Sequence, residues 1–216
     1  MQAFLLAGGR SRRMGRDKAR LELAGQPLVA HMLGKCRALG MAAAICGNRP
    51  DLAALAPIVP DPALPGDDSP GPLAGILAAL EASGTELNLV LAVDMPGAPV
   101  ELLRWMVERA ERTQSSATIP FVAGRAQPLC AVYHREIAAG IHRGVERGER
   151  RVFPVLMEAA VRADVFDVES VAATSAIDPL PADFPHEWFR NLNTPHEFAL
   201  YAARHPSNKL VVESAE

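Results

Sequence analysis

The sequence predicts one α/β domain of three layers, with a mostly parallel central sheet and a mixed-sheet extension in its C-terminal half. Short apolar runs alternate with helical patterns through the first half of the chain, as in strand–helix–strand units. These runs are continuously apolar, which is typical of strands buried on both faces of a parallel sheet. A chain of 216 residues can bury a sizeable core as one domain. Together these observations indicate a Rossmann-like fold.

The first half of the chain predicts four strands with helical connections. The expected strands are 3–7, 42–46, 57–61 and 87–94, and the expected helices are 27–39, 51–55, 72–82 and 100–112. In open parallel sheets, ligands bind at the carboxyl ends of the strands. Residues that directly follow these strands are therefore the first candidates for a functional site.

The pattern changes after Thr113. Segments 117–123 and 127–134 are separated only by a GRAQ turn, which predicts a hairpin or a mixed-sheet extension. Two helical stretches (136–148 and 151–160), a strand (163–168), a proline-rich loop (179–185) and a final helix (194–204) follow. Thr194 and Pro195 suit the N-cap and first residue of that helix. We expect a domain over 1–205 and a flexible tail over 206–216.

Composition excludes several classes of protein. A net charge of −3 and a pI near 6.1 argue against general affinity for nucleic acid. The N-terminus resembles no signal peptide, and no stretch approaches the ~20 apolar residues of a membrane span. The three cysteines form no CxxC pair, so we expect free thiols in a reducing compartment. A cytoplasmic protein without nucleic-acid or membrane partners is expected.

A glycine-rich, basic stretch, LLAGGRSRRMGRDKARLEL (5–23), follows the first apolar run. Gly8 and Gly9 would let backbone amides approach an anion closely, and the cations behind them would neutralise it. The spacing fits neither a Walker A loop nor the dinucleotide fingerprint, so a different nucleotide-binding fold is indicated. A tight surface turn with a solvated basic face is the alternative. The cations are Arg10, Arg12, Arg13, Arg16, Lys18 and Arg20.

Within this stretch, LAGGRSRRMGRDK resembles the signature of nucleotidyltransferases of GT-A-like fold. Four further blocks, PGPLAGI (70–76), LAVDMP (91–96), GERRV (148–152) and NLNTPHEF (191–198), resemble those of the molybdenum cofactor guanylyltransferases. The resemblance spans residues 3 to about 200. It implies transfer of GMP from GTP to the phosphate of metal-bound molybdopterin, with release of pyrophosphate. It also implies Mg²⁺ as the cofactor and molybdoenzyme maturation proteins as partners.

Lys18 and Arg13 are the residues we expect at the triphosphate, Lys18 by its place in the signature and Arg13 because a guanidinium grips phosphate bidentately, with Arg12 less favoured. Asp17 is expected to orient Lys18. Asp94 ends an apolar strand beside the glycine-rich loop, and hard cations prefer oxygen ligands, so we expect it to bind magnesium and GTP. An N-cap for the next helix is the alternative for Asp94. The other expected GTP contacts are Leu6, Ala7, Gly8, Gly9, Cys46, Asp61 and Leu73.

Some of these assignments have competing interpretations. Asp61 matches a family position that contacts the nucleotide, but a turn aspartate is equally typical. The loop before Leu73 suits contact with the base, and it is also an ordinary helix start with Pro72 at its first position. The family often carries asparagine where this chain has Cys46, although Asn48 lies close enough in sequence to substitute.

The resemblance implies an anionic pterin as the second substrate, and two further motifs could bind it. Arg150 and Arg151 in GERRV, and Asn191 and Asn193 in NLNTP, are candidates to contact it. A solvated helix start and turn or cap chemistry are the alternatives. Two rival functions also remain: a related nucleotidyltransferase that uses CTP or another phosphorylated acceptor, and a nucleotide-binding or cofactor-binding chaperone without catalytic activity.

Overall fold

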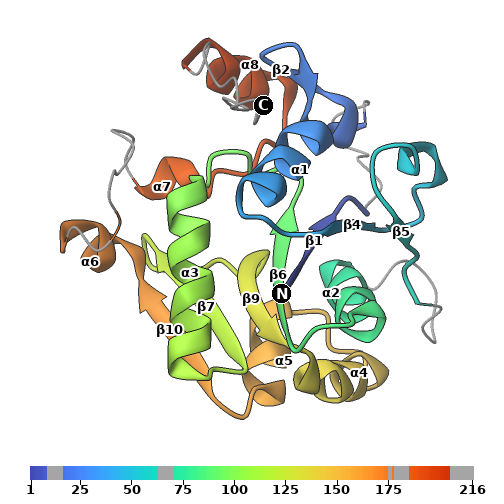
Figure 1. Ribbon diagram of the computed structural model, residues 1–216, viewed down its shortest axis with the longest axis vertical. Helices are drawn as coiled ribbons and strands as arrows, with labels where there is room; N and C mark the ends of the chain where they lie inside the picture. The colour runs from blue at the N-terminus through green and yellow to red at the C-terminus, as the bar shows by residue number, and fades with distance from the viewer. Residues whose placement is uncertain (9–16, 63–70, 175–176, 178–184, 205–216) are drawn as a thin grey trace.

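The central sheet runs in the order β10-β7-β9-β6-β1-β4-β5 (Figure 1). Strand β8 pairs with β7 beside this path. The strands of the sheet are β1 (Gln2–Leu6), β4 (Ala43–Cys46), β5 (Ile58–Val59), β6 (Leu87–Ala92), β7 (Ala117–Val122), β8 (Arg125–Ala126), β9 (Cys130–His134) and β10 (Ala163–Asp167). This computed structural model describes residues 1–8, 17–62, 71–174, 177 and 185–204. The expected tail over 206–216 lies outside the described residues.

The sheet is parallel on one side and mixed on the other. Strands β5, β4, β1 and β6 are parallel neighbours, so their carboxyl ends share one edge. Strand β9 runs antiparallel to both β6 and β7, and β10 returns parallel to β7. The predicted parallel sheet with a mixed C-terminal extension is confirmed.

Helices cover both faces of the sheet, as three-layer packing requires (Figure 1). They are α1 (Leu28–Ala38), α2 (Pro72–Ala82), α3 (Val100–Thr113), α4 (Ala138–Glu146), α5 (Val152–Ala159), α6 (Val168–Ala173), α7 (Pro185–Trp188) and α8 (Pro195–Arg204). Along β1, Ala3 and Leu5 pack into a cluster with α1 and α3, whereas Phe4 and Leu6 pack into a second cluster with α2, α4 and α5. Such alternation follows from the two-residue period of a strand. Burying a side chain such as Phe4 contributes about 1.5–3 kcal/mol.

Local structure departs from expectation where prolines interrupt it. The helix expected over 51–55 is only a 3₁₀ turn, η2 (Pro50–Leu52), and the strand expected over 57–61 is the two-residue β5. Pro57 and Pro60 flank β5 and cannot donate to a sheet ladder, which limits its length. The hairpin of β2 (Glu22–Leu23) and β3 (Gln26–Pro27) was not predicted, although its Ala24-Gly25 turn has the positive φ angles that such hairpins need.

Other expectations are confirmed. Thr194 Oγ1 accepts from the amide of Glu197 at 3.1 Å, so Thr194 caps α8 as predicted. The three cysteines, Cys36, Cys46 and Cys130, are free and buried. None of the described helices combines the length and the apolar content that a membrane crossing needs.

Candidate active site

Three segments far apart in the sequence meet at Lys18. Lys18 begins the 3₁₀ turn η1 (Lys18–Arg20), Asp94 follows β6, and Asn193 precedes α8. The Lys18 Nζ atom donates to Asp94 Oδ2 at 2.8 Å and to Asn193 Oδ1 at 2.6 Å. The side chains of Lys18 and Asp94 are each 19% exposed, so the ion pair is partly shielded from water. The structure therefore brings together two residues predicted for the nucleotide and one predicted for the pterin.

The backbone around Asp94 is fixed from two directions. The amide of Leu192 donates to the carbonyl of Asp94 at 2.9 Å, and Leu192 is fully buried. The amide of Val93 donates to the carbonyl of Leu6, which ties the end of β6 to the end of β1. Helix α3 begins at Val100 with Pro99 at its N-cap, so the alternative that Asp94 caps this helix is wrong.

Asn193 is held by the cap of α8. The backbone amide of Asn193 donates to Glu197 Oε2 at 2.9 Å, and the hydroxyl of Thr194 donates to the same oxygen at 3.0 Å. Both hydrogen bonds lower the pKa of Glu197, and the one from the Thr194 hydroxyl has the larger effect. The turn and cap interpretation of NLNTP is therefore correct for the backbone, while the Asn193 side chain remains directed to Lys18.

A second part of the site is built from close approaches between glycines. Gly47, at φ +129°, lies so close to Gly8 that a Cβ on Gly47 would sit 2.9 Å from the Gly8 Cα and amide nitrogen. A Cβ on Gly8 would sit 3.2 Å from Asp61 Oδ2. The glycines thus let the segments that follow β1 and β4 approach one another beside Asp61. Gly47 was not predicted, although its position directly after a strand was a signal.

Asp61 presents an acceptor at this point. Its Oδ1 atom is buried and has no hydrogen-bond partner within the described part of the chain, and burial raises its pKa. A turn aspartate would normally bond nearby backbone amides, so the turn interpretation does not account for Oδ1. A buried acceptor without a partner is costly, and a bound donor would satisfy it.

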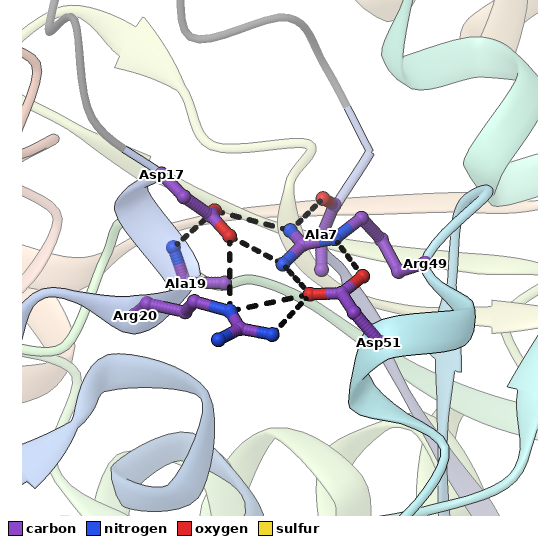
Figure 2. A network of polar contacts seen from close by, with 6 residues as sticks. All are labelled: Ala7, Asp17, Ala19, Arg20, Arg49 and Asp51. Carbon is purple, nitrogen blue, oxygen red and sulfur yellow. Dashed lines mark hydrogen bonds and ion pairs between the residues drawn. The ribbon is translucent and has the colours of Figure 1, made fainter.

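Asp17 acts on the turn that carries Lys18. Asp17 Oδ1 accepts from the amide of Ala19 at 3.1 Å and so caps η1. Its carboxylate also pairs with Arg49, as Figure 2 shows. Asp17 was expected to orient Lys18, and its carboxylate contacts the backbone of the turn and two arginines rather than the Lys18 ammonium.

Two expected nucleotide contacts lie in the core. Cys46 and Leu73 are both 0% exposed and pack in the same apolar cluster between the sheet and α2. Burial, followed by the nearby charge of Asp61, raises the pKa of the Cys46 thiol to about 12. Neither residue offers surface to a base in this structure. By contrast Asn48, the suggested substitute for Cys46, is exposed.

The GERRV motif forms a separate turn. Glu149 Oε1 accepts from the backbone amides of Arg150 and Arg151 at 2.9 Å, and the Arg151 side chain pairs with the Glu149 carboxylate. A cleft of about 340 Å³ beside this turn is lined by Arg147, Glu149 and Glu158 among others, and Arg147 is already paired with Glu158 at 2.7 Å. None of the contacts among described residues joins the two arginines to Lys18 or Asp94. Asn191 is exposed.

The remaining predicted residues divide into two groups. Leu6 and Ala7 are buried, their carbonyls accept from Val93 and Arg49, and Gly8 is exposed. Gly9, Arg12 and Arg13 lie outside the described residues.

The atoms at this site that could coordinate a metal ion are mainly oxygens. Within the described ranges, no group of three or more His, Cys, Asp or Glu side chains could hold a metal by themselves. The Asp94 carboxylate and the Asn193 amide oxygen both lie within hydrogen-bond distance of Lys18 Nζ. Magnesium commonly takes one or two carboxylates and completes its shell with phosphates and water. The residues present therefore fit a magnesium ion that arrives with a phosphate substrate.

Comparison with known proteins gives this geometry a context. A relative from Mycobacterium bovis BCG, named probable molybdenum cofactor guanylyltransferase, is 42% identical over 166 residues, covering 70% of this chain and 77% of the relative. A relative of the same name from Mycobacterium marinum is 37% identical over 158 residues, with 70% and 77% covered.

Solved structures share the fold. Molybdopterin-guanine dinucleotide biosynthesis protein A from Archaeoglobus fulgidus superposes with a TM-score of 0.74 at 25% identity, covering 94% of this chain and 98% of that one. The 2-C-methyl-D-erythritol 4-phosphate cytidylyltransferase from Thermus thermophilus matches with a TM-score of 0.62 at 16% identity, over 93% and 96% of the two chains, which supports the fold alone. Residues 3–162 match the MobA-like NTP transferase domain. The chain belongs to this family, and it is a nucleotidyltransferase.

Proposed function

We propose that this nucleotidyltransferase transfers GMP from GTP to the terminal phosphate of molybdopterin. An oxygen of the molybdopterin phosphate attacks the α-phosphorus of GTP, the bond from that phosphorus to the α–β bridging oxygen breaks, and pyrophosphate leaves with the electron pair. The product is a phosphoanhydride, molybdopterin guanine dinucleotide. The relatives named as probable molybdenum cofactor guanylyltransferases support this choice among nucleotidyl transfers.

The meeting of Lys18, Asp94 and Asn193 is the observation that carries the proposal. Nucleotidyl transfer asks a protein mainly to position phosphates and to neutralise their charge. Lys18 would donate to phosphate oxygens whose charge grows as pyrophosphate leaves, and Asn193 would hold the Lys18 ammonium at that position. Arg13 and Arg12 of the signature are proposed to contact the triphosphate as well.

Asp94 is the residue we propose for magnesium. The ion would supply charge neutralisation on the reacting phosphates. Asp94 suits this role because its backbone is fixed by Leu192 and its carboxylate lies at the shared edge of the parallel strands. Its exposure of 19% leaves room for a ligand to reach the carboxylate.

Asp61 supports a nucleoside site beside Gly8. The acceptor Oδ1 would pair with an N–H or O–H donor of the guanosine, with the phosphates extending over the glycines toward Lys18. Leu6, Ala7, Gly8 and Gly9 are proposed to line this path with backbone atoms. Cys46 and Leu73 would support it from the core, because the structure buries both.

The acceptor substrate is proposed to bind on the α8 side of Lys18. Asn193 contacts Lys18 directly, and Asn191 is exposed two residues earlier in the same turn. Arg150 and Arg151 are weaker candidates, because the carboxylate of Glu149 already accepts from their backbone amides and pairs with the Arg151 side chain. Molybdoenzyme maturation proteins, which would receive the product in the cytoplasm, are the proposed partners.

A pyrophosphate-release assay tests the function. The protein, Mg²⁺ and molybdopterin are combined with GTP, CTP, ATP or UTP in turn, and the product is identified by its mass. We expect pyrophosphate release with GTP and with none of the other three nucleotides, together with a product of the mass of the guanine dinucleotide. Preference for CTP would establish the cytidylyltransferase alternative. Binding of a nucleotide without release of pyrophosphate from any of the four nucleotides would favour the chaperone without catalytic activity.

Thermal stability gives an independent measure of base preference. A ligand that binds only the folded state stabilises it by mass action, so GTP should raise Tm more than CTP or ATP at equal concentration. Equal shifts from all three nucleotides would indicate recognition of phosphate alone.

A further inference from the structure

Arg49 uses all of its donors within one network (Figure 2). Its Nε donates to Asp51 Oδ1 at 2.9 Å, and Nη2 donates to Asp51 Oδ2 at 2.9 Å and to Asp17 Oδ2. Its Nη1 donates to Asp17 Oδ1 at 3.1 Å and to the carbonyl of Ala7 at 3.4 Å. A guanidinium has five N–H donors, and each has an acceptor here. The hydrogen bond to Asp51 is the largest of the interactions that raise the pKa of Arg49.

The network connects residues on either side of the glycine-rich motif. Ala7 directly precedes the glycine pair in the sequence, and Asp17 directly precedes Lys18. Asp17 also caps the turn that carries Lys18 through the amide of Ala19. Arg49 comes from the connection after β4 and is only 17% exposed, so its guanidinium is held by the fold rather than by solvent.

We infer that Arg49 is a positioning residue for nucleotidyl transfer, which sets the location of Lys18 by fixing Asp17 relative to the end of β1. The inference rests on the role proposed for Lys18. Arg49 itself is saturated with acceptors from the protein and has no donor left for a phosphate. Its effect on the reaction therefore passes through Asp17 and the η1 turn to the ammonium of Lys18.

Lysine could not replace Arg49 in this arrangement. An ammonium carries three donors at one point, whereas the acceptors on Asp17, Asp51 and Ala7 surround a planar fork. Arg49→Lys keeps the charge and most of the apolar stem, so it removes the planar fork while a cation stays beside the partly exposed carboxylates of Asp17 and Asp51. It is the variant that separates positioning from charge.

Arg109 provides a matched control. It also forms a bidentate pair, with Nε 2.6 Å and Nη2 2.9 Å from the two carboxylate oxygens of Asp164, and it is 26% exposed. This pair joins α3 to β10, at the opposite end of the sheet from β4. Arg109→Lys should disturb a comparable ion pair without changing Lys18.

Chemical labelling of Lys18 tests the inference without any substrate. The full-length protein is treated briefly with acetic anhydride, and acetylation of Lys18 is quantified by mass spectrometry. In the wild type, hydrogen bonds to Asp94 and Asn193 should slow the reaction. Arg49→Lys should speed it at least about 5-fold, the ratio that corresponds to about 1 kcal/mol. Arg109→Lys should leave the rate unchanged.

A double-mutant cycle on turnover completes the test. Arg49→Lys should lower kcat about 10- to 100-fold, since a misplacement near 1 Å has effects of that order, while KM for GTP changes little. In the Lys18→Ala background the same substitution should lower kcat less than about 2-fold, because its effect passes through Lys18.

The outcomes distinguish this inference from the proposed function. Unchanged labelling of Lys18 in Arg49→Lys overturns the inference, and so does an unchanged kcat or a full effect in the Lys18→Ala background. Faster labelling in a protein that releases no pyrophosphate with any nucleotide would instead support the role of Arg49 in placing Lys18 and overturn the proposed reaction.

Discussion

The ammonium group of Lys18 lies 2.8 Å from a carboxylate oxygen of Asp94, although the two residues are 76 positions apart in the sequence. Strands β1 and β6 are adjacent and parallel, so the segments that follow them emerge at the same edge of the sheet. Each charge therefore holds the other at the place where phosphates are proposed to bind. Substituting either residue tests a different part of the proposed reaction.

Lys18→Ala should lower turnover at least ~100-fold, the scale of removing one preorganised group that stabilises developing charge. Binding of GTP should weaken less, because only interactions that strengthen in the transition state speed the chemical step. Steady-state kinetics with GTP and molybdopterin measure both quantities.

The choice of control for this substitution comes from the structure. Arg20 follows Lys18 closely and its side chain is 57% exposed, but it donates to Asp51 at 2.9 Å and so belongs to the Arg49 network. Arg37, exposed in the last turn of α1, is a better control. Arg37→Ala should change turnover little. Equally small effects of Lys18→Ala and Arg37→Ala would contradict the assignment of the basic stretch to phosphate.

Asp94→Asn should leave the fold intact and remove most turnover. Asparagine keeps the shape and an acceptor for Lys18, so the backbone contact with Leu192 should persist. The lost carboxylate would remove the anchor proposed for magnesium. Circular dichroism and a magnesium titration of activity check both parts, and full activity in a well-folded variant would exclude the metal role.

The proximity of Lys18 and Asp94 could be predicted from the ends of the strands. The basic motif and Asp94 each follow an apolar run, and parallel packing brings such positions to one edge of the sheet. The same reasoning could not show that Arg49 bonds Asp17, because a salt bridge between connections depends on side-chain geometry in three dimensions.

Burial marks another limit of the sequence. Cys46 and Leu73 were expected at the nucleotide because of their motif positions, but both side chains turn into the core between the sheet and α2. Along β4 a one-residue difference reverses the face that carries Cys46, whereas Leu73 lies in the first turn of α2. Motif spacing alone does not show which way either side chain faces. The length of β5 shows another limit. The apolar run predicts a strand over 57–61, but the prolines on either side restrict it to Ile58–Val59.

Gly47→Ala should destabilise the protein and weaken GTP binding together. Gly47 has φ +129°, and an added Cβ would lie 2.9 Å from the backbone of Gly8. Strain of about 1–3 kcal/mol is expected for an alanine in this conformation, which corresponds to a Tm lower by about 2–10 °C for a chain of this size. Displacement of Gly8 should also raise Kd for GTP.

Gly84 is the matched control for this glycine. A Cβ there meets no atom within 4 Å. Gly84→Ala should leave both Tm and Kd close to the wild-type values in differential scanning fluorimetry and calorimetric titration. An equal response of the two variants would argue against a close approach between Gly47 and Gly8.

The contribution of Lys35 to the free energy of unfolding should rise as the pH increases from about 8 to 10.5. It is 5% exposed, and its Nζ donates to the carbonyl of Ala98 in the segment between Asp94 and α3. Burial lowers its pKa from 10.5 to about 8, an effect opposed in part by the nearby charge of Glu101. Between these two pH values the unfolded chain binds more protons at this residue than the folded chain does.

The cost of burying the charge is therefore fully present below pH 8 and disappears as the pH rises toward 10.5. The free energy of unfolding of the wild type relative to Lys35→Met should increase by up to about 1.4 kcal/mol per pH unit across this interval. Urea denaturation of both proteins at pH 7, 8, 9 and 10 measures the difference, and the comparison cancels the titration of groups that the two proteins share. A difference that stays constant with pH would show that the Lys35 ammonium is as well solvated in the folded protein as in the unfolded chain.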